Sequence, residues 1–90
     1  MGKRKYWQSY EKTVANRHRG RPIGGPGQPD YIRGNVRGEA KLRSRPLNRS
    51  EVMSECKKGR TEIVCSKGFT NQAVRYVKRY RPSVKLIHHP

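Results

Sequence analysis

The chain alternates between stretches with helical and with extended hydrophobic patterning. Near its start, Trp7, Tyr10 and Val14 recur at a spacing of three to four residues, which places their side chains on one face of a helix. This apolar stripe predicts a first helix over residues 3–19. Gly20 follows it, and glycine is a usual residue at the C-terminal end of a helix.

A short strand and a β-hairpin are expected next. Residues 21–23 can form the strand, and residues 24–28 are a loop of Gly, Pro and Gln. Beyond this loop, the turn dipeptide Gly34-Asn35 divides residues 30–42 into two extended halves. The two halves predict a hairpin, in which side chains two residues apart share a face.

The second helix has the clearest start in the chain. Asn48 can cap this helix, and Glu51, three residues later, can complete a capping box. Leu47 can pack on Val52 as a hydrophobic staple. Gly59 then predicts the end of the helix.

A strand, a helix and a strand complete the predicted elements. Residues 61–66 are rich in β-branched side chains and form the best strand candidate. Thr70 is expected to cap a third helix that Pro82 stops, and residues 84–87 form a closing strand. The strand–helix–strand unit over residues 61–87 is expected to be a right-handed crossover within one sheet.

The predicted elements make one small α/β domain over residues 1–90. The chain is too short for a second domain, and because only 31% of its residues are apolar, its core is thin. We therefore expect a central mixed β-sheet flanked by helices, stabilised further by dimerisation or by a bound substrate.

The charge of the chain points to a polyanionic partner. Its 22 Lys and Arg residues against six Asp and Glu residues give a formal net charge of +16, and charge of this size favours nucleic acid. A membrane surface is the weaker alternative, because no strongly apolar amphipathic helix accompanies the basic residues. No apolar run is long enough for a signal core or a membrane span, so we expect a cytoplasmic protein. Cys56 and Cys65 are expected to be reduced thiols.

The predicted hairpin can bring two acids and a lysine together. Glu39 and Lys41 share one face of its second strand, and Asp30, at the start of the first strand, can sit opposite them. Two carboxylates at a metal's width bind a hard cation such as Mg²⁺, and a neighbouring lysine can stabilise charge that develops on a phosphate. This arrangement suits phosphodiester hydrolysis. The alternative for the two carboxylates is ion pairing with a nearby arginine: Arg33, Arg37 or Arg43.

The remaining acids include a second Glu-x-Lys sequence, Glu55-Cys56-Lys57, within the second predicted helix. Its Glu and Lys would lie about 200° apart around the helix axis and diverge, so they cannot form the strand-borne site. Glu51 is explained by helix capping. Glu55 and Glu62 are interpreted as solvated charges.

The hairpin residues also carry a resemblance to a known family. Pro29-Asp30 followed by Glu39-Ala40-Lys41 resembles the signature of the PD-(D/E)xK nuclease superfamily. The predicted order of elements is similar to the αβββαβ core of that superfamily with a helix and a strand appended. The resemblance implies a minimal restriction-endonuclease-like fold and nuclease activity.

Two further stretches extend this resemblance over most of the chain. An acid on the first helix, Glu11, then a Gly-rich loop, Pro-Asp and Glu-x-Lys, is similar to archaeal Holliday junction resolvases, in which that acid joins the metal site. Without this resemblance, the alternative interpretation of Glu11 is an ion pair with a basic neighbour on the same helix. Residues 61–74, together with residues 84–87, look like the end of Mrr-type restriction nuclease domains.

The sequence thus predicts a DNA endonuclease that depends on Mg²⁺ or Mn²⁺. Asp30 and Glu39 are the expected metal ligands, with Glu11 and the backbone carbonyl of Ala40 as further ligands and Lys41 beside the attacking water. Basic side chains, and glycines that allow close approach, are expected to hold the DNA backbone without reading sequence. These residues are Arg21, Gly25, Gly27, Arg43, Arg45 and Lys67.

The family likeness implies branched DNA, such as a four-way junction, as the preferred substrate. A junction has two-fold symmetry, so a homodimer with C2 symmetry is expected. One alternative is a non-catalytic basic nucleic-acid-binding protein, either of ribosomal or packaging type or a nuclease fold that has lost its chemistry. Another is a restriction-like enzyme that cuts duplex DNA.

Overall fold

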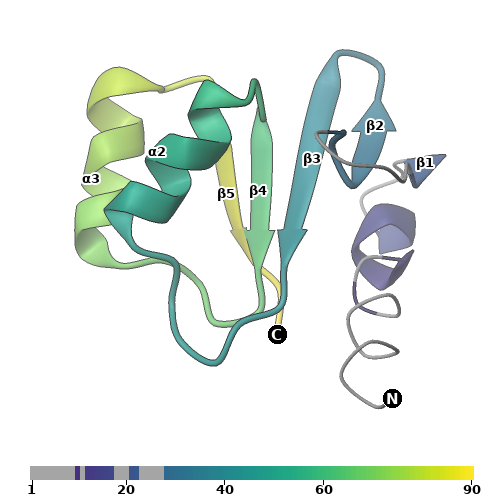
Figure 1. Cartoon of the computed structure of the whole chain (residues 1–90), viewed down its shortest axis with the longest axis horizontal. Helices are drawn as coiled ribbons and strands as arrows, with labels where there is room; N and C mark the ends of the chain where they lie inside the picture. Colours follow the sequence, from purple (N-terminus) through teal and green to yellow (C-terminus); the bar gives the residue numbers. More distant parts are fainter. Residues whose placement is uncertain (1–9, 11, 18–20, 23–27) are drawn as a thin grey trace.

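The computed structural model describes residue 10 and residues 12–17 and 28–90, and the backbone alone of residues 21–22. Residues 10 and 12–17 are helical. The described strands form one mixed sheet in the order β1-β2-β3-β4-β5 (Figure 1). The bounds of the remaining elements are β1 (Arg21–Pro22), β2 (Tyr31–Arg33), β3 (Val36–Lys41), α2 (Arg49–Lys57), β4 (Glu62–Cys65), α3 (Asn71–Tyr80) and β5 (Lys85–His88).

The first three strands form an antiparallel meander. β1 pairs with β2, and β2 pairs with β3 with Tyr31 opposite Gly38 and Arg33 opposite Val36. Gly34 has a φ angle of 58°, which glycine adopts without steric cost. The tight turn therefore forms where the dipeptide Gly34-Asn35 predicts it.

The last three strands are parallel neighbours, and α2 and α3 connect them. β3 pairs with β4 and β4 with β5, and parallel neighbours need a crossover connection. Buried side chains of both helices join one core cluster on the same face of the sheet. Two successive crossovers of the same hand and direction place their helices in this way. The strand–helix–strand unit predicted for residues 61–87 is present.

The predicted capping residues begin both helices. In α2, the Asn48 side chain accepts a hydrogen bond from the Glu51 amide at 2.9 Å, and the Glu51 carboxylate accepts one from the Asn48 amide at 3.1 Å. In α3, the Thr70 hydroxyl accepts a hydrogen bond from the Ala73 amide at 3.2 Å. These bonds satisfy donors that the first turn of a helix leaves unpaired.

The sheet is covered on both faces. The face toward α2 and α3 carries one core cluster of buried residues, Leu47, Val52, Ile63, Cys65, Ala73 and Val77. The other face carries a second cluster, which includes side chains of the N-terminal helical segment: Val14, Ala15, Tyr31, Ala40 and Val64. The α/β fold with a central mixed sheet between helices is therefore the one that the sequence predicts, in the predicted order of elements.

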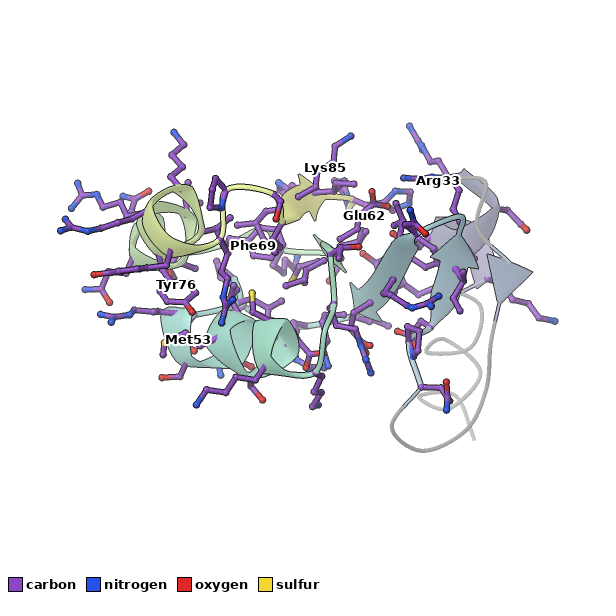
Figure 2. All side chains as sticks on the ribbon, turned by 90° about the horizontal axis from the view of Figure 1, so that it is seen from above. Arg33, Met53, Glu62, Phe69, Tyr76 and Lys85 are labelled. Carbon is purple, nitrogen blue, oxygen red and sulfur yellow. The ribbon has the colours of Figure 1, made fainter. Side chains whose placement is uncertain are left out.

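Glu62 is not the solvated charge that the sequence suggested. Its side chain is buried on the sheet face that carries Tyr31, and its two oxygens accept hydrogen bonds from the Tyr31 hydroxyl and from Arg33 at 3.0 Å (Figure 2). The Tyr31 ring lies over Gly38, where a Cβ atom would overlap it. Burial and the bond to Glu62 raise the pKa of Tyr31. Glu62 in β4 therefore bonds to side chains of β2, on the other side of β3. Local sequence patterning does not reveal a contact of this kind.

Both cysteines are free, as predicted, and Cys65 is buried in β4. Among the described residues, no helix is both long enough and apolar enough to cross a membrane.

Candidate active site

The candidate site is built on the start of β2 and the C-terminal half of β3. The Asp30 amide donates to the Gly38 carbonyl at 2.8 Å, and the Asp30 carboxylate accepts from the Ala40 amide at 2.8 Å. This second bond places the Asp30 carboxylate against the β3 backbone at the residue between Glu39 and Lys41. The hairpin therefore brings the Asp30 carboxylate to the backbone of the residue that separates Glu39 from Lys41.

Glu39 and Lys41 contact each other on the sheet face that α2 covers. The Lys41 Nζ atom lies 3.4 Å from Glu39 Oε2. Glu39 is buried, with an exposed fraction of 8%, and Lys41 is partly buried. Their shared face follows from the two-residue period of a strand, as the sequence predicts.

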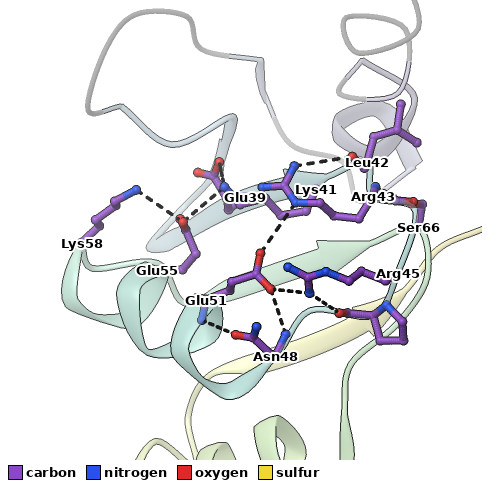
Figure 3. A network of polar contacts seen from close by, with 11 residues as sticks. Glu39, Lys41, Leu42, Arg43, Arg45, Asn48, Glu51, Glu55, Lys58 and Ser66 are labelled. Carbon is purple, nitrogen blue, oxygen red and sulfur yellow. Dashed lines mark hydrogen bonds and ion pairs between the residues drawn. The ribbon is translucent and has the colours of Figure 1, made fainter. Parts of the chain in front are cut away.

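Glu55 joins this pair, although the sequence suggested a solvated charge. It is helical, as predicted, but its side chain is buried and its Oε2 atom lies 3.2 Å from Lys41 Nζ (Figure 3). Lys58 Nζ lies 3.4 Å from the same oxygen. The prediction failed because α2 packs over the face of β3 that carries Glu39 and Lys41, and this packing turns an inward helix position toward the site.

Arg60 is the residue that sequence reasoning missed. Its Nε atom donates to Glu39 Oε1 at 2.9 Å and lies 3.8 Å from Glu55 Oε1. Arginine pairing of Glu39 was the alternative considered from the sequence, but the partner is Arg60 rather than Arg33, Arg37 or Arg43. The only local signal was an arginine directly after Gly59, whose φ of 86° ends the helix and turns the chain toward β4.

One oxygen in this network lacks a donor among the described residues. Glu55 Oε1 is buried and accepts no hydrogen bond from the part of the chain that the structure describes. A buried acceptor without a donor is costly, so such atoms commonly mark the place of a water or an ion. Three cations, Lys41, Lys58 and Arg60, surround the carboxylates of Glu39 and Glu55.

The oxygen donors present suit a hard cation in their chemistry. Mg²⁺ and Mn²⁺ take carboxylate and carbonyl oxygens, and Asp30, Glu39, Glu55 and the Ala40 carbonyl offer them. Within the described ranges, however, no three His, Cys, Asp or Glu side chains converge as a ready-made metal centre. Arg60 and Lys41 lie against the two oxygens of Glu39. A metal at Glu39 would have to replace at least one of these cations.

A cleft of about 250 Å³ opens beside this network, between the end of β3 and α2. Two cations, Lys41 and Arg43, and two carboxylates, Glu51 and Glu55, line it. Hydroxyls of Ser50 and Ser54 complete the polar lining. The cleft has room for a phosphate group with its waters, and a bound phosphate would compete with Glu55 for Lys41 and with Glu51 for Arg43.

The basic residues predicted to hold DNA differ in their surroundings. Arg45 Nη1 donates to Glu51 Oε1 at 3.0 Å, and Arg43 Nε lies 3.9 Å from Glu51 Oε2 (Figure 3). Burial raises the pKa of Glu51, but bonds from Asn48 and Arg45 and the charges of Arg45 and Arg43 outweigh it, so the pKa is lowered. Lys67 is exposed on the turn after β4.

Four of the predicted site residues cannot be placed. Glu11, Gly25 and Gly27 lie outside the described residues, and for Arg21 the described part is the β1 backbone. Their predicted roles stay predictions.

Comparison of the chain with protein-family models, with curated proteins and with solved structures finds no match.

Proposed function

We propose that this chain is a divalent-metal-dependent DNA endonuclease of the kind that its PD-(D/E)xK-like residues suggest. The observation that supports the proposal is the contact of Glu39 with Lys41 on β3, with the Asp30 carboxylate bonded to the Ala40 amide between them and Lys41 lining a cleft that has room for a phosphate group. The net charge of +16 supports a nucleic-acid substrate.

Asp30, Glu39 and the Ala40 carbonyl would hold Mg²⁺ or Mn²⁺, with Glu11 as the further acid. Such an ion, when bound, lowers the pKa of its water and neutralises charge on the scissile phosphate. The ion pair of Glu39 with Arg60 is the interaction that must give way, and Arg60 would then be left with Glu55, 3.8 Å away.

The chain's own side chains account for the other roles. Lys41 is held between two carboxylates, 3.4 Å from Glu39 and 3.2 Å from Glu55, and lines the cleft. In that position its ammonium can orient the attacking water or stabilise charge developing on the phosphate. Arg43 lines the same cleft, and Lys67 is exposed on the turn that follows β4. Both side chains are suited to contacts with backbone phosphates.

The second candidate is a non-catalytic nucleic-acid-binding protein, and one observation favours it. Glu39, which the chemistry needs as a ligand, is paired with Arg60 at 2.9 Å and with Lys41 at 3.4 Å. If these pairs are permanent, the network serves to anchor α2 on the sheet. The basic surface would then bind nucleic acid without cutting it.

One assay separates the two candidates. Supercoiled plasmid, a synthetic four-way junction and linear duplex are incubated with Mg²⁺ or Mn²⁺ and wild type, Asp30→Asn or Glu39→Gln. The matched control is Glu51→Gln, which removes the same charge at the edge of the cleft and keeps a residue that can complete a capping box. We expect each site variant to cut at least about 100-fold more slowly, with DNA binding retained, and the control to cut normally.

The outcomes assign the function directly. If wild type binds DNA but cuts none of the substrates with either metal, the endonuclease proposal fails and the binding protein replaces it. Preference for the junction would support a resolvase, which acts in DNA recombination or repair. Equal cutting of linear duplex would favour the restriction-like alternative.

A resolvase would act as a C2 homodimer, because the two strands that it cuts are related by two-fold symmetry. Light scattering with and without a junction measures this, and a protein that stays monomeric on the junction would contradict it. A cytoplasmic location is part of the same proposal.

A further inference from the structure

A second groove, of about 270 Å³, lies on the solvent side of α2 and α3. Three arginines, two tyrosines and a glutamine line it: Arg49, Gln72, Arg75, Tyr76, Arg79 and Tyr80. Figure 2 shows Tyr76 between the two helices. No carboxylate is among these lining residues, so within the part of the chain that the structure describes the groove carries cationic and aromatic side chains and one amide.

Tyr76 and Tyr80, one helical turn apart on α3, form an aromatic pair. Their ring centroids are 5.4 Å apart with the rings tilted by 40°. Tyr76 is partly buried, whereas Tyr80 is 59% exposed and is the large hydrophobic residue that the described surface leaves most open. The packing of one ring on the other holds Tyr80 in place with apolar area toward solvent.

Guanidinium groups lie over both rings. Arg49, from α2, is 5.8 Å from the centroid of Tyr76, and Arg79 is 5.6 Å from that of Tyr80. This stacking on tyrosine rings explains part of the role of Arg49 and Arg79 even when no ligand is bound. It does not account for Arg75 or Lys78, which are also exposed on α3, a helix without a single Asp or Glu.

We propose that this groove binds unpaired nucleotides of a nucleic acid. Aromatic side chains provide stacking platforms for successive bases, and neighbouring cations track the backbone phosphates; together they are the usual means of binding a single strand. Bases within a duplex are already stacked on their neighbours, so only an unpaired base can present its face to Tyr80. Gln72 adds an amide that can bond to a base edge.

The groove is close to the candidate active site along the chain. Arg49 lines the groove, and the next residue, Ser50, lines the cleft with Lys41, so a single helix separates them. A strand that leaves a duplex at a branch could therefore occupy the groove while an adjoining phosphodiester reaches the cleft. This last link rests on the proposed function, whereas binding of unpaired nucleotides does not.

Fluorescence anisotropy in EDTA tests the binding without any cutting. The probes are a labelled oligothymidine and a labelled duplex with the same number of phosphates. We expect Tyr80→Ala to weaken binding of the oligothymidine about tenfold and to leave duplex binding within about twofold, because the variant carries the same charge and duplex affinity is mainly electrostatic. Tyr80→Phe keeps the stacking ring and should bind as wild type does.

A charge pair completes the test. Arg79→Gln should weaken binding of the single strand more than Lys85→Gln, which removes an equal charge that is also exposed, on β5. Retained folding is checked by circular dichroism.

If Tyr80→Ala changes the binding of neither probe, or weakens the binding of both to the same extent, the proposal is wrong. It is also wrong if Tyr80→Ala weakens an Asp- and Glu-rich peptide but not the oligothymidine, since the groove would then serve an acidic protein segment. The anisotropy assay contains no free divalent metal and measures binding alone, so its result does not depend on whether the chain cuts DNA.

Discussion

Two buried glutamates on neighbouring strands face opposite sides of the sheet and belong to polar networks that differ in how completely their oxygens are hydrogen-bonded. Glu62 in β4 is aligned with Gly38, so Glu39, one residue further along β3, points to the other face. The oxygens of Glu62 accept hydrogen bonds from Tyr31 and Arg33. Glu39 lies instead in a network with Arg60, Lys41 and Glu55 in which one buried oxygen, Glu55 Oε1, lacks a donor among the described residues.

Under the proposed function, this difference separates a structural use of buried charge from a catalytic one. A buried carboxylate whose oxygens are bonded ties strands together and gains nothing from a further ligand. A network with more cations than carboxylates and an unsatisfied oxygen can exchange partners when a ligand arrives. The Glu62 cluster therefore anchors the sheet, and the Glu39 cluster is the one that we assign to chemistry.

The largest effect is expected from removing the arginine of the Glu39 network. Arg60→Gln removes the buried cation that donates to Glu39 Oε1 and leaves the Glu39 carboxylate with the longer contact to Lys41, which costs about 3–5 kcal/mol of unfolding free energy. Urea unfolding in EDTA measures this loss, and Arg60→Lys should lose less because it keeps the charge. Under the proposed function, Mg²⁺ or Mn²⁺ should recover part of the loss and raise the Tm of Arg60→Gln more than that of wild type.

The matched control is Lys58→Gln, since Lys58 is half exposed and its pair with Glu55 at 3.4 Å is worth at most about 1 kcal/mol. If neither metal raises the Tm of Arg60→Gln, the Glu39 network is structural, as the Glu62 network is. The proposed difference between the two networks would then be wrong.

A smaller effect is expected in the Glu62 cluster. Tyr31→Phe removes the hydroxyl that donates to Glu62 and leaves a buried carboxylate oxygen without that donor, at a cost of about 1–3 kcal/mol. Tyr10→Phe removes a hydroxyl bonded to the His89 carbonyl at 2.8 Å, at a partly buried site where water can replace it, and should cost less. Cutting per folded molecule should stay normal in both variants. A selective loss of cutting in Tyr31→Phe would show that the sheet face opposite the cleft also serves the chemistry.

The smallest effect concerns Glu51 at the edge of the cleft. Its pKa is lowered in the folded protein, so its contribution to stability is present above the unfolded pKa and is lost as pH falls through the folded pKa. Glu51→Gln should therefore make acid unfolding slightly less steep, as measured by Tm between neutral and acidic pH. An unchanged pH profile would mean that the capping box, rather than the charge of Arg45 and Arg43, accounts for the role of Glu51.

Local features of the fold were predictable because their signals lie within a few residues of each other. Asn48 with Glu51 and Thr70 mark the helix starts, and Gly34-Asn35 marks the turn of the hairpin. The closeness of Glu39 to Lys41 follows from the same short-range logic, because a strand repeats every two residues.

The partners of these residues were not predictable in the same way. Glu55 was interpreted as solvated and is buried against Lys41, and Arg60 was not considered for Glu39, although it lies only 21 residues further along the chain. Both errors have one cause: whether a charge on a helix or loop is solvated depends on which face of which strand that element covers.

By itself the sequence determined the elements, their order, the strongly positive net charge and the residues that share a strand face, since each of these depends on local periodicity or on composition. The tertiary structure alone decided which carboxylates are satisfied and which are not. Packing α2 across β3 brings Glu55 and Arg60 to Glu39, and packing α3 beside α2 sets Tyr76 under Arg49. Contacts between elements depend on how whole faces fit together, and no single stretch of the chain contains that information.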